Sequence, residues 1–165
     1  MKKTAMSVVF VLFAAVFFCS CKTQNTLEVF LVSGDLPEND IIVLNELTLE
    51  ESPVLTLNDI RQFYWDKQEF TLKDGSLSEL LNRDIPVSGL PYVLAVNGKR
   101  IYMGKFWTPL SSAWPYSPSI SIAFENPDVT RYSVYYDGDE SEVKQIIFDE
   151  RIRKVLESAG LLQAK

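Results

Sequence analysis

A hairpin signal in the middle of the chain constrains the fold more than any other local pattern. Pro91–Val96 is apolar at nearly every position, Asn97-Gly98 follows, and Arg100–Phe106 is a second strand-like run. An Asn-Gly pair between two apolar runs favours a two-residue turn, because both residue types tolerate the positive φ that such a turn requires. The sequence therefore predicts an antiparallel pair whose first strand is buried on both faces.

Other segments predict further strands and a few short helices. Apolar and β-branched residues between turn residues indicate strands at 26–32, 41–49, 63–72, 119–124 and 132–136. One helical turn is expected at 57–62 with Asn58 as its cap, and a short helix at 77–81 with Ser76 and Glu79 as a capping box. Apolar residues at helical spacing between positions 146 and 159 predict a further helix, which should end before Gly160. This pattern predicts an α+β domain, a mostly antiparallel sheet with two or three helices on one side.

The composition excludes several classes of chemistry. The chain contains no histidine, and Cys19 and Cys21 are its only cysteines. Ser-His-Asp and Cys-His hydrolysis are therefore impossible, as are zinc sites that need His or Cys ligands from the folded part. No Gly-x-Gly-x-x-Gly or Walker-type phosphate loop is present, so no cofactor is expected. Oxygen-ligand calcium or magnesium sites stay possible.

The N-terminal segment has the layout of an export signal. Lys2 and Lys3 are followed by the almost continuously apolar run 5–18 and then by Cys19-Ser20-Cys21. This run is shorter than the roughly 20 apolar residues that a spanning helix needs, so a cleaved signal peptide is favoured over an uncleaved anchor. The segment resembles a bacterial lipoprotein signal, in which a small residue precedes the modified cysteine.

That resemblance implies a lipid anchor. Ser20 precedes Cys21 whereas Phe18 precedes Cys19, so Cys21 is the expected attachment site. Cys21 would carry a diacylglycerol thioether and an amide-linked acyl chain. Two or three acyl chains anchor a protein stably in a membrane, whereas a single chain binds only marginally. Residues 1–20 are then the signal, 21–25 a polar tether and 26–162 a single α+β domain. By the same resemblance, Lys22 in place of aspartate at the second mature position implies the outer membrane, and the lack of an acidic cluster in 22–25 implies a domain that faces the periplasm.

The charge balance bears on possible partners. Lys2 and Lys3 would leave with the signal, so 14 of the 16 basic residues remain against 22 acidic ones, a net charge of −8. An acidic domain has no electrostatic reason to bind nucleic acid. Anionic lipid would also repel it, so the lipid on Cys21 would have to supply membrane attachment.

Two segments of the mature chain resemble a known family. Pro53–Ile60 reads Pro-Val-Leu-Thr-Leu-Asn-Asp-Ile, and Pro91–Tyr102 is an apolar strand that meets Asn-Gly-Lys-Arg-Ile. Both are similar to elements of the periplasmic head of the SecD family of protein-export factors, in the same order. Asn97 stands where that family has aspartate. The resemblance implies a ferredoxin-like α+β head and carries no functional residues over.

One segment stands out as a candidate binding surface. Residues 106–118 combine four aromatic residues, four hydroxyl residues and three prolines, and the prolines oppose long regular structure. If exposed, this segment would offer stacking surface and hydroxyls to a sugar ring or an extended peptide. If Trp107 and Trp114 fold inward, it would close one end of the core. The candidate ligand-binding residues are Trp107, Ser111, Ser112, Trp114 and Tyr116.

Weaker candidates involve catalysis or metal binding. Ser111 or Ser112 with Lys105 could form a Ser-Lys hydrolase only if the lysine were buried and its pKa lowered. Paired acids at Glu50-Glu51 could run glycoside chemistry at a suitable separation. The acidic run 137–142 has oxygen ligands of the kind calcium prefers, but it does not match the EF-hand loop, and a solvated acidic turn is the simpler interpretation.

The sequence thus predicts a lipid-anchored envelope protein with a non-enzymatic interaction domain that binds an envelope protein or peptide. An alternative is a glycan-binding or glycan-processing accessory lipoprotein. A third hypothesis is an enzyme that uses only Asp, Glu, Ser, Tyr or Lys.

Overall fold

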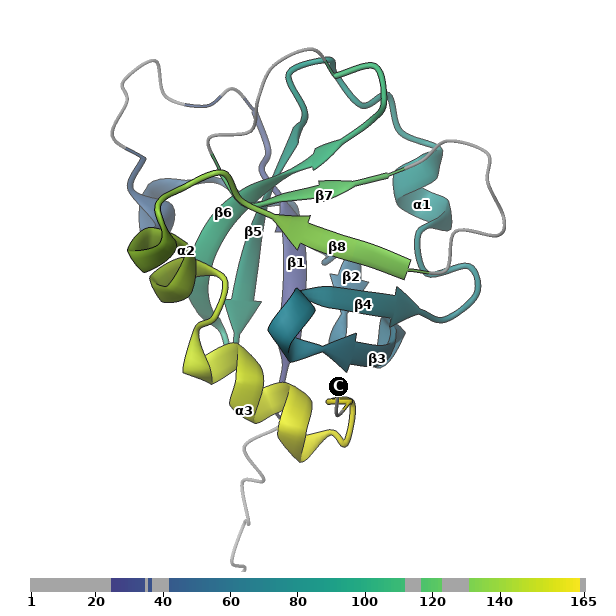
Figure 1. Cartoon of the computed structure of the whole chain (residues 1–165). Coiled ribbons are helices and arrows are strands. Elements are labelled where there is room, and N and C mark those ends of the chain that lie inside the picture. Colours follow the sequence, from purple (N-terminus) through teal and green to yellow (C-terminus); the bar gives the residue numbers. More distant parts are fainter. Residues whose placement is uncertain (1–24, 35, 37–41, 112–116, 123–130, 164–165) are drawn as a thin grey trace, which may run out of the picture.

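The fold is described from a computed structural model (Figure 1), which describes residues 25–34, 36, 42–111, 117–122 and 131–163. In this part of the chain eight strands form one mixed sheet that curves into a nearly closed, barrel-like shape. The strands are β1 Leu27–Leu31, β2 Leu55–Thr56, β3 Ile60–Tyr64, β4 Glu69–Leu72, β5 Leu90–Val96, β6 Lys99–Trp107, β7 Ser119–Ser121 and β8 Arg131–Tyr135. Three short α-helices accompany them: α1 Ser78–Leu81, α2 Glu140–Ile146 and α3 Glu150–Ser158.

The strand order explains why the sheet nearly closes on itself. The order is β2-β1-β5-β6-β7-β8-β4-β3, and the described pairs are antiparallel except β6 with β7. The two edge strands are joined by the 3-10 helix η2, Leu57–Asp59. Because this connection is so short, the ends of the sheet are brought close together. The α+β and mostly antiparallel expectation is confirmed. The ferredoxin-like expectation is wrong, because eight curved strands replace a small open sheet.

The predicted hairpin is confirmed as β5 and β6. Asn97 and Gly98 adopt φ values of 50° and 72°, which is the left-handed region that a two-residue hairpin turn needs. Leu90 pairs with Phe106 at one end and Val96 with Lys99 at the other. Val93–Val96 are all buried, as expected for a strand that is covered on both faces.

Other expected elements are shorter or of another type. Residues 44–46 form the 3-10 helix η1, Leu44–Glu46, instead of a strand, because Arg100 Nη1 donates to the carbonyls of Leu44 and Leu47. Residues 63–72 hold the end of one strand and all of the next. The 3-10 helix η3, Trp65–Lys67, and left-handed Gln68 reverse the chain between them.

The helices also differ from expectation in their boundaries and caps. Residues 146–159 contain the end of α2 and the whole of α3, which begins after its cap Asp149. The first turn of η2 is capped by Thr56 and Asp59 rather than by Asn58. Ser76 does not cap α1, because its hydroxyl donates to Asp59 Oδ1. Gly160 ends α3 as predicted, with Leu161 N–H donating to Leu156.

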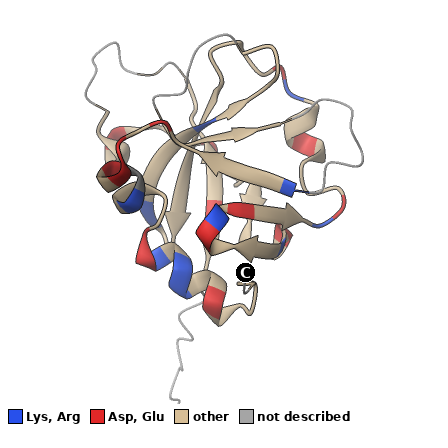
Figure 2. Cartoon of the chain, in the orientation of Figure 1, with Lys and Arg blue, Asp and Glu red and all other residues tan. Residues whose placement is uncertain are grey.

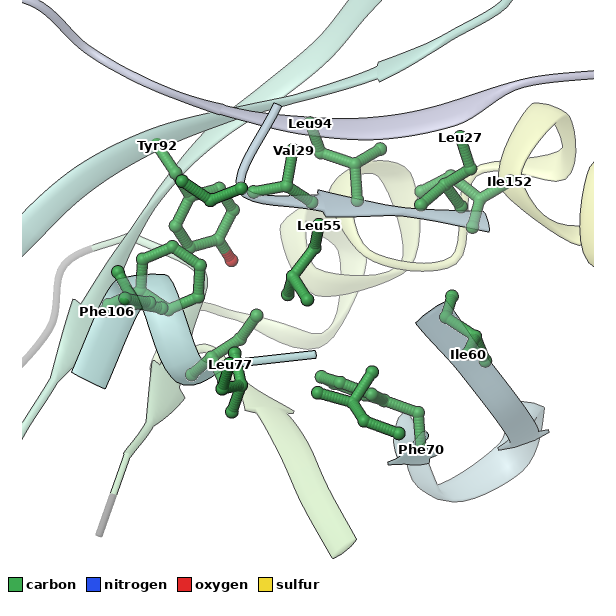
Figure 3. Packing of buried hydrophobic residues seen from close by; sticks show 14 of the residues in the cluster. Leu27, Val29, Leu55, Ile60, Phe70, Leu77, Tyr92, Leu94, Phe106 and Ile152 are labelled. Atoms are coloured by element: carbon green, nitrogen blue, oxygen red, sulfur yellow. The ribbon is translucent and has the colours of Figure 1, made fainter. Parts of the chain in front are cut away.

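The core lies inside the curved sheet and under α3 (Figure 3). Side chains from β1, β3, β4, β5 and β6 meet Ile152, Val155 and Leu156 of α3. Tyr92 and Phe106 are fully buried at 0% exposure, with ring centroids 4.6 Å apart. No helix among the described residues has the length and apolar character needed to cross a bilayer.

Candidate functional site

The sheet has two ends that differ in what they carry. β1 runs antiparallel to β5, with Leu27 opposite Val96 and Leu31 opposite Tyr92. The described chain therefore enters the fold beside the Asn97-Gly98 turn. We call this the tether end. The opposite end, where Leu90 pairs with Phe106, holds the loops 86–89 and 108–111; we call it the distal end. Figure 1 shows the two ends at the bottom and top of the molecule.

A tight turn at 108–111 forms the beginning of the distal end. Ser111 N–H donates to the Thr108 carbonyl at 2.9 Å, and Pro109 occupies the second position of the turn, which its fixed φ suits. Thr108 N–H donates to Ser111 Oγ, and Leu110 N–H donates to Thr108 Oγ1, both at 3.3 Å. The serine and threonine side chains thus shape the backbone. The turn presents the Leu110 side chain to solvent.

The distal end carries the two most exposed large apolar side chains among the described residues. Leu110 is 73% exposed and Val87 is 62% exposed. Val87 belongs to a second turn, in which Gly89 N–H donates to the Pro86 carbonyl at 2.8 Å. The pairing of Leu90 with Phe106 places the two turns on neighbouring strands. Two exposed apolar side chains at the same end of the sheet make the distal end the candidate contact surface among the described residues.

Of the aromatic candidates, only Trp107 lies among the described residues. Its side chain is buried at 9% exposure, and its indole Nε1 has no hydrogen-bond partner in the part of the chain that the structure describes. The ring therefore belongs to the core and offers no stacking face to a ligand. Ser111 is half-buried. Ser112, Trp114 and Tyr116 lie outside the described residues.

The serine and lysine considered for hydrolysis each have another partner. Lys105 Nζ donates to the Ser88 carbonyl at 3.2 Å at the surface. Ser111 Oγ accepts from Thr108 N–H, as described above. The arrangement thus gives Lys105 neither the burial nor the serine contact that a Ser-Lys base requires. Ser112 cannot be placed, because it lies outside the described residues.

Two of the carboxylates considered for catalysis or metal binding, Glu50 and Asp139, have structural partners. Glu50 accepts two hydrogen bonds from Arg83, at 2.7 and 2.9 Å. Asp139 precedes α2 and accepts from the N–H groups of Ser141 and Glu142, as a helix cap does. The hydroxyl of Ser141 and these N–H groups lower the pKa of Asp139. Within the described ranges, no group of three or more His, Cys, Asp or Glu side chains is arranged to hold a metal ion.

Among the described residues, the cavity inside the sheet is too small for a ligand. This cavity measures about 40 Å³ and is lined by apolar side chains such as Leu55, Leu94 and Ile120. A volume of this size holds at most a water molecule or two, well below the several hundred Å³ of a ligand pocket. Burial raises the pKa of Tyr102. Burial also raises the pKa of Tyr92, and the neighbouring Tyr102 adds to that shift, so both side chains stay neutral.

Comparison of the chain with family models, with curated proteins and with solved structures gave no match. Sequence reasoning missed Val87 and did not single out Leu110. The turn patterns Pro86-Val87-Ser88-Gly89 and Thr108-Pro109-Leu110-Ser111 contain the signal, because central residues of a proline turn point to solvent.

Proposed function

We propose that the chain is a lipid-anchored envelope lipoprotein whose folded part is a non-enzymatic interaction domain. Cys21 would carry the lipid, and the distal end would bind another envelope protein or peptide. One observation carries the proposal: the exposed apolar turns lie at the opposite end of the sheet from the residues that follow the proposed anchor. A domain that is tethered to the membrane at one end can expose its opposite end to a binding partner.

The filled interior supports binding over chemistry. A cavity of about 40 Å³ leaves no pocket inside the sheet for a substrate. Among the candidate groups that the structure describes, Glu50 is held in an ion pair, Asp139 caps a helix and Lys105 contacts a backbone carbonyl. These observations favour recognition by an outer surface, and the apolar distal turns are the best-supported part of it.

The anchor has a direct test. Mass spectrometry of the membrane-associated protein should find a mature chain that begins at Cys21 and carries diacylglycerol and acyl groups. Cys21→Ala should yield an unlipidated protein that no longer partitions with detergent, whereas Cys19→Ala should behave as the wild type. An unmodified N-terminus beginning at Met1 would overturn the anchor.

The distal surface is tested by photo-crosslinking in intact cells. A photoreactive residue at position 110 should capture one envelope protein reproducibly, and Val87→Asp should abolish the capture. The same probe at Lys73, which is exposed elsewhere on the domain, is the matched control. Equal capture from both positions would contradict the proposal.

The glycan-binding alternative receives less support, because the buried Trp107 ring cannot stack on a sugar. Titration with cell-wall and plant-type oligosaccharides, followed by tryptophan fluorescence, separates the two functions. Quenching that disappears in Trp114→Ala, together with a negative crosslinking result at position 110, would favour glycan binding.

A further inference from the structure

A polar groove lies at the tether end, between the β5–β6 turn and α3. Its volume is about 410 Å³, far larger than the interior cavity. Its lining includes Asn25, Asn97, Lys99, Arg151, Lys154 and Val155. No acidic side chain lines this groove among the described residues, although the mature chain as a whole is strongly acidic.

The charge in the groove comes mainly from two lysines. Lys99 and Lys154 are exposed, and neither has an ion-pair partner among the described residues. Arg151 is held by Asp149, with Nη2 and Oδ2 at 2.6 Å, so its charge is largely compensated. Figure 2 shows basic residues on α3 next to the point where the described chain begins. The groove thus offers two ammonium groups and nearby amide donors to an anion.

The N-terminal segment is fixed to this groove. Asn25 Nδ2 donates to Ser158 Oγ at 2.9 Å, and Thr26 N–H donates to Asn97 Oδ1 at 2.8 Å. Three residues separate Asn25 from Cys21, and a fully extended chain over these four residue steps spans about 14 Å. If Cys21 carries lipid, the tether keeps the groove within about 14 Å of the bilayer surface, which is less than two Debye lengths of about 8 Å.

We propose that this groove binds the phosphate of anionic phospholipid headgroups in the membrane that holds the Cys21 lipid. Lysine ammonium groups bind phosphate as point charges, and each lysine near an anionic surface strengthens binding about five-fold. The basic groove would face the membrane while the acidic remainder of the domain is repelled from it. The domain would then stand upright, with Leu110 directed away from the bilayer. This inference rests on the proposed lipid anchor.

Amine acetylation of the lipidated protein tests the proposal without any substitution. The protein is inserted into vesicles of phosphatidylcholine alone or with one third phosphatidylglycerol, and the modification of each lysine is followed by mass spectrometry. Lys99 and Lys154 should react several-fold more slowly in the anionic vesicles, and 1 M salt should remove this protection. Lys67 and Lys73, which are exposed elsewhere, are internal controls and should react equally in both.

The possible outcomes separate the inference from the anchor. Lipidated protein that enters both vesicle types with equal Lys99 and Lys154 reactivity overturns the groove proposal and leaves the anchor intact. Protein that lacks acyl groups and enters neither overturns the anchor. Protection by inorganic phosphate in detergent, without protection on anionic vesicles, would mean a free-anion site and would also overturn the headgroup assignment.

Substitutions give a second readout of orientation. A dye on Leu110→Cys reports energy transfer to an acceptor at the headgroups of anionic vesicles. The charge-removing pair Lys99→Gln and Lys154→Gln should increase this transfer because the domain tilts. The matched pair Lys67→Gln and Lys73→Gln should leave it unchanged. An increase that is equal for both pairs, or absent for both, contradicts the proposal.

Discussion

The Tyr92 ring lies directly across Gly104, its partner on the neighbouring strand. Tyr92 on β5 pairs with Gly104 on β6, and a Cβ atom built at position 104 would lie 2.4 Å from Tyr92 Cζ. The ring sits between Tyr102 and Phe106, which flank Gly104 on the same face of β6. Because Gly104 has no side chain, the core has room for the Tyr92 ring.

Gly104→Ala should destabilise the fold strongly. The added methyl group would meet the Tyr92 ring and also the Pro118 carbonyl oxygen at 2.5 Å, and the latter is backbone that cannot rotate away. Overpacking of this kind costs about 3 kcal/mol. Urea denaturation should show this loss in the free energy of unfolding. Ser121→Ala, at an exposed position on β7, is the control and should change it by less than about 0.5 kcal/mol. A similar small effect at 104 would contradict the close contact.

Tyr92→Phe should stabilise the protein. The Tyr92 hydroxyl is fully buried, and the neighbouring Tyr102 helps to raise its pKa but is not placed for a hydrogen bond of normal length and angle. Removing an unsatisfied buried hydroxyl without changing the ring should raise the free energy of unfolding by about 1 kcal/mol. Chemical denaturation at pH 7 measures this. A loss of stability of similar size would mean that the hydroxyl has a partner.

The same variant should resist alkali better than the wild type. Burial raises the folded-state pKa of Tyr92 well above its ordinary value, whereas the unfolded chain ionises near pH 10. The stability that depends on neutral Tyr92 is therefore complete below about pH 10 and is lost as the pH rises above it. Stability curves between pH 8 and 11 should diverge, with the wild type falling more steeply than Tyr92→Phe.

The fold was predictable where local chemistry decides the structure. The Asn97-Gly98 turn and the Gly160 stop depend on residues that tolerate positive φ, so their neighbours hardly matter. Residues 44–46 could not be predicted, because their conformation depends on Arg100, more than 50 positions away. The curvature of the sheet was also hidden, since it follows from which strands pair, and pairing is a long-range property.

The candidate site was predictable only in its location. The composition of 106–118 drew attention to the distal end, but it favoured rings over the aliphatic side chains that are exposed there. Whether Trp107 points inward depends on the partners of β6, which the local sequence does not specify. The basic groove was hidden for a similar reason. Lys99 and Lys154 are far apart in the chain, and only the packing of α3 on β5 brings them together.

Two substitutions at Asn97 should separate its two roles. Asn97 has φ of 50° and also accepts a hydrogen bond from Thr26 N–H. Asn97→Gly keeps the backbone and loses the bond, so about 1 kcal/mol should be lost. Asn97→Ala also adds left-handed strain, so the loss should be about 2 kcal/mol. Hydrogen exchange at Thr26 should become faster in both variants. Equal losses of stability in Asn97→Gly and Asn97→Ala would mean that the left-handed backbone of Asn97 makes no separate contribution.

Asp149 should contribute stability that disappears in acid. It caps α3, with Oδ1 accepting from Arg151 N–H at 2.8 Å, and Oδ2 pairs with Arg151 Nη2. The Arg151 side chain is the main cause that lowers the pKa of Asp149 below its ordinary value. The contribution is therefore present above about pH 3.9, the unfolded value, and is lost as the pH falls through the depressed folded-state pKa.

Asp149→Asn should show this dependence. It keeps a capping oxygen but removes the charge, so at pH 7 the free energy of unfolding should fall by about 1 kcal/mol. The gap to the wild type should shrink as the pH falls from 5 to 2, because the wild-type carboxylate becomes protonated. Asp74→Asn, at a side chain that is 96% exposed, is the matched loss of a surface carboxylate and should cost less than about 0.5 kcal/mol at pH 7. A gap at Asp149 that stays constant down to pH 2 would mean that the carboxylate charge contributes nothing to the cap.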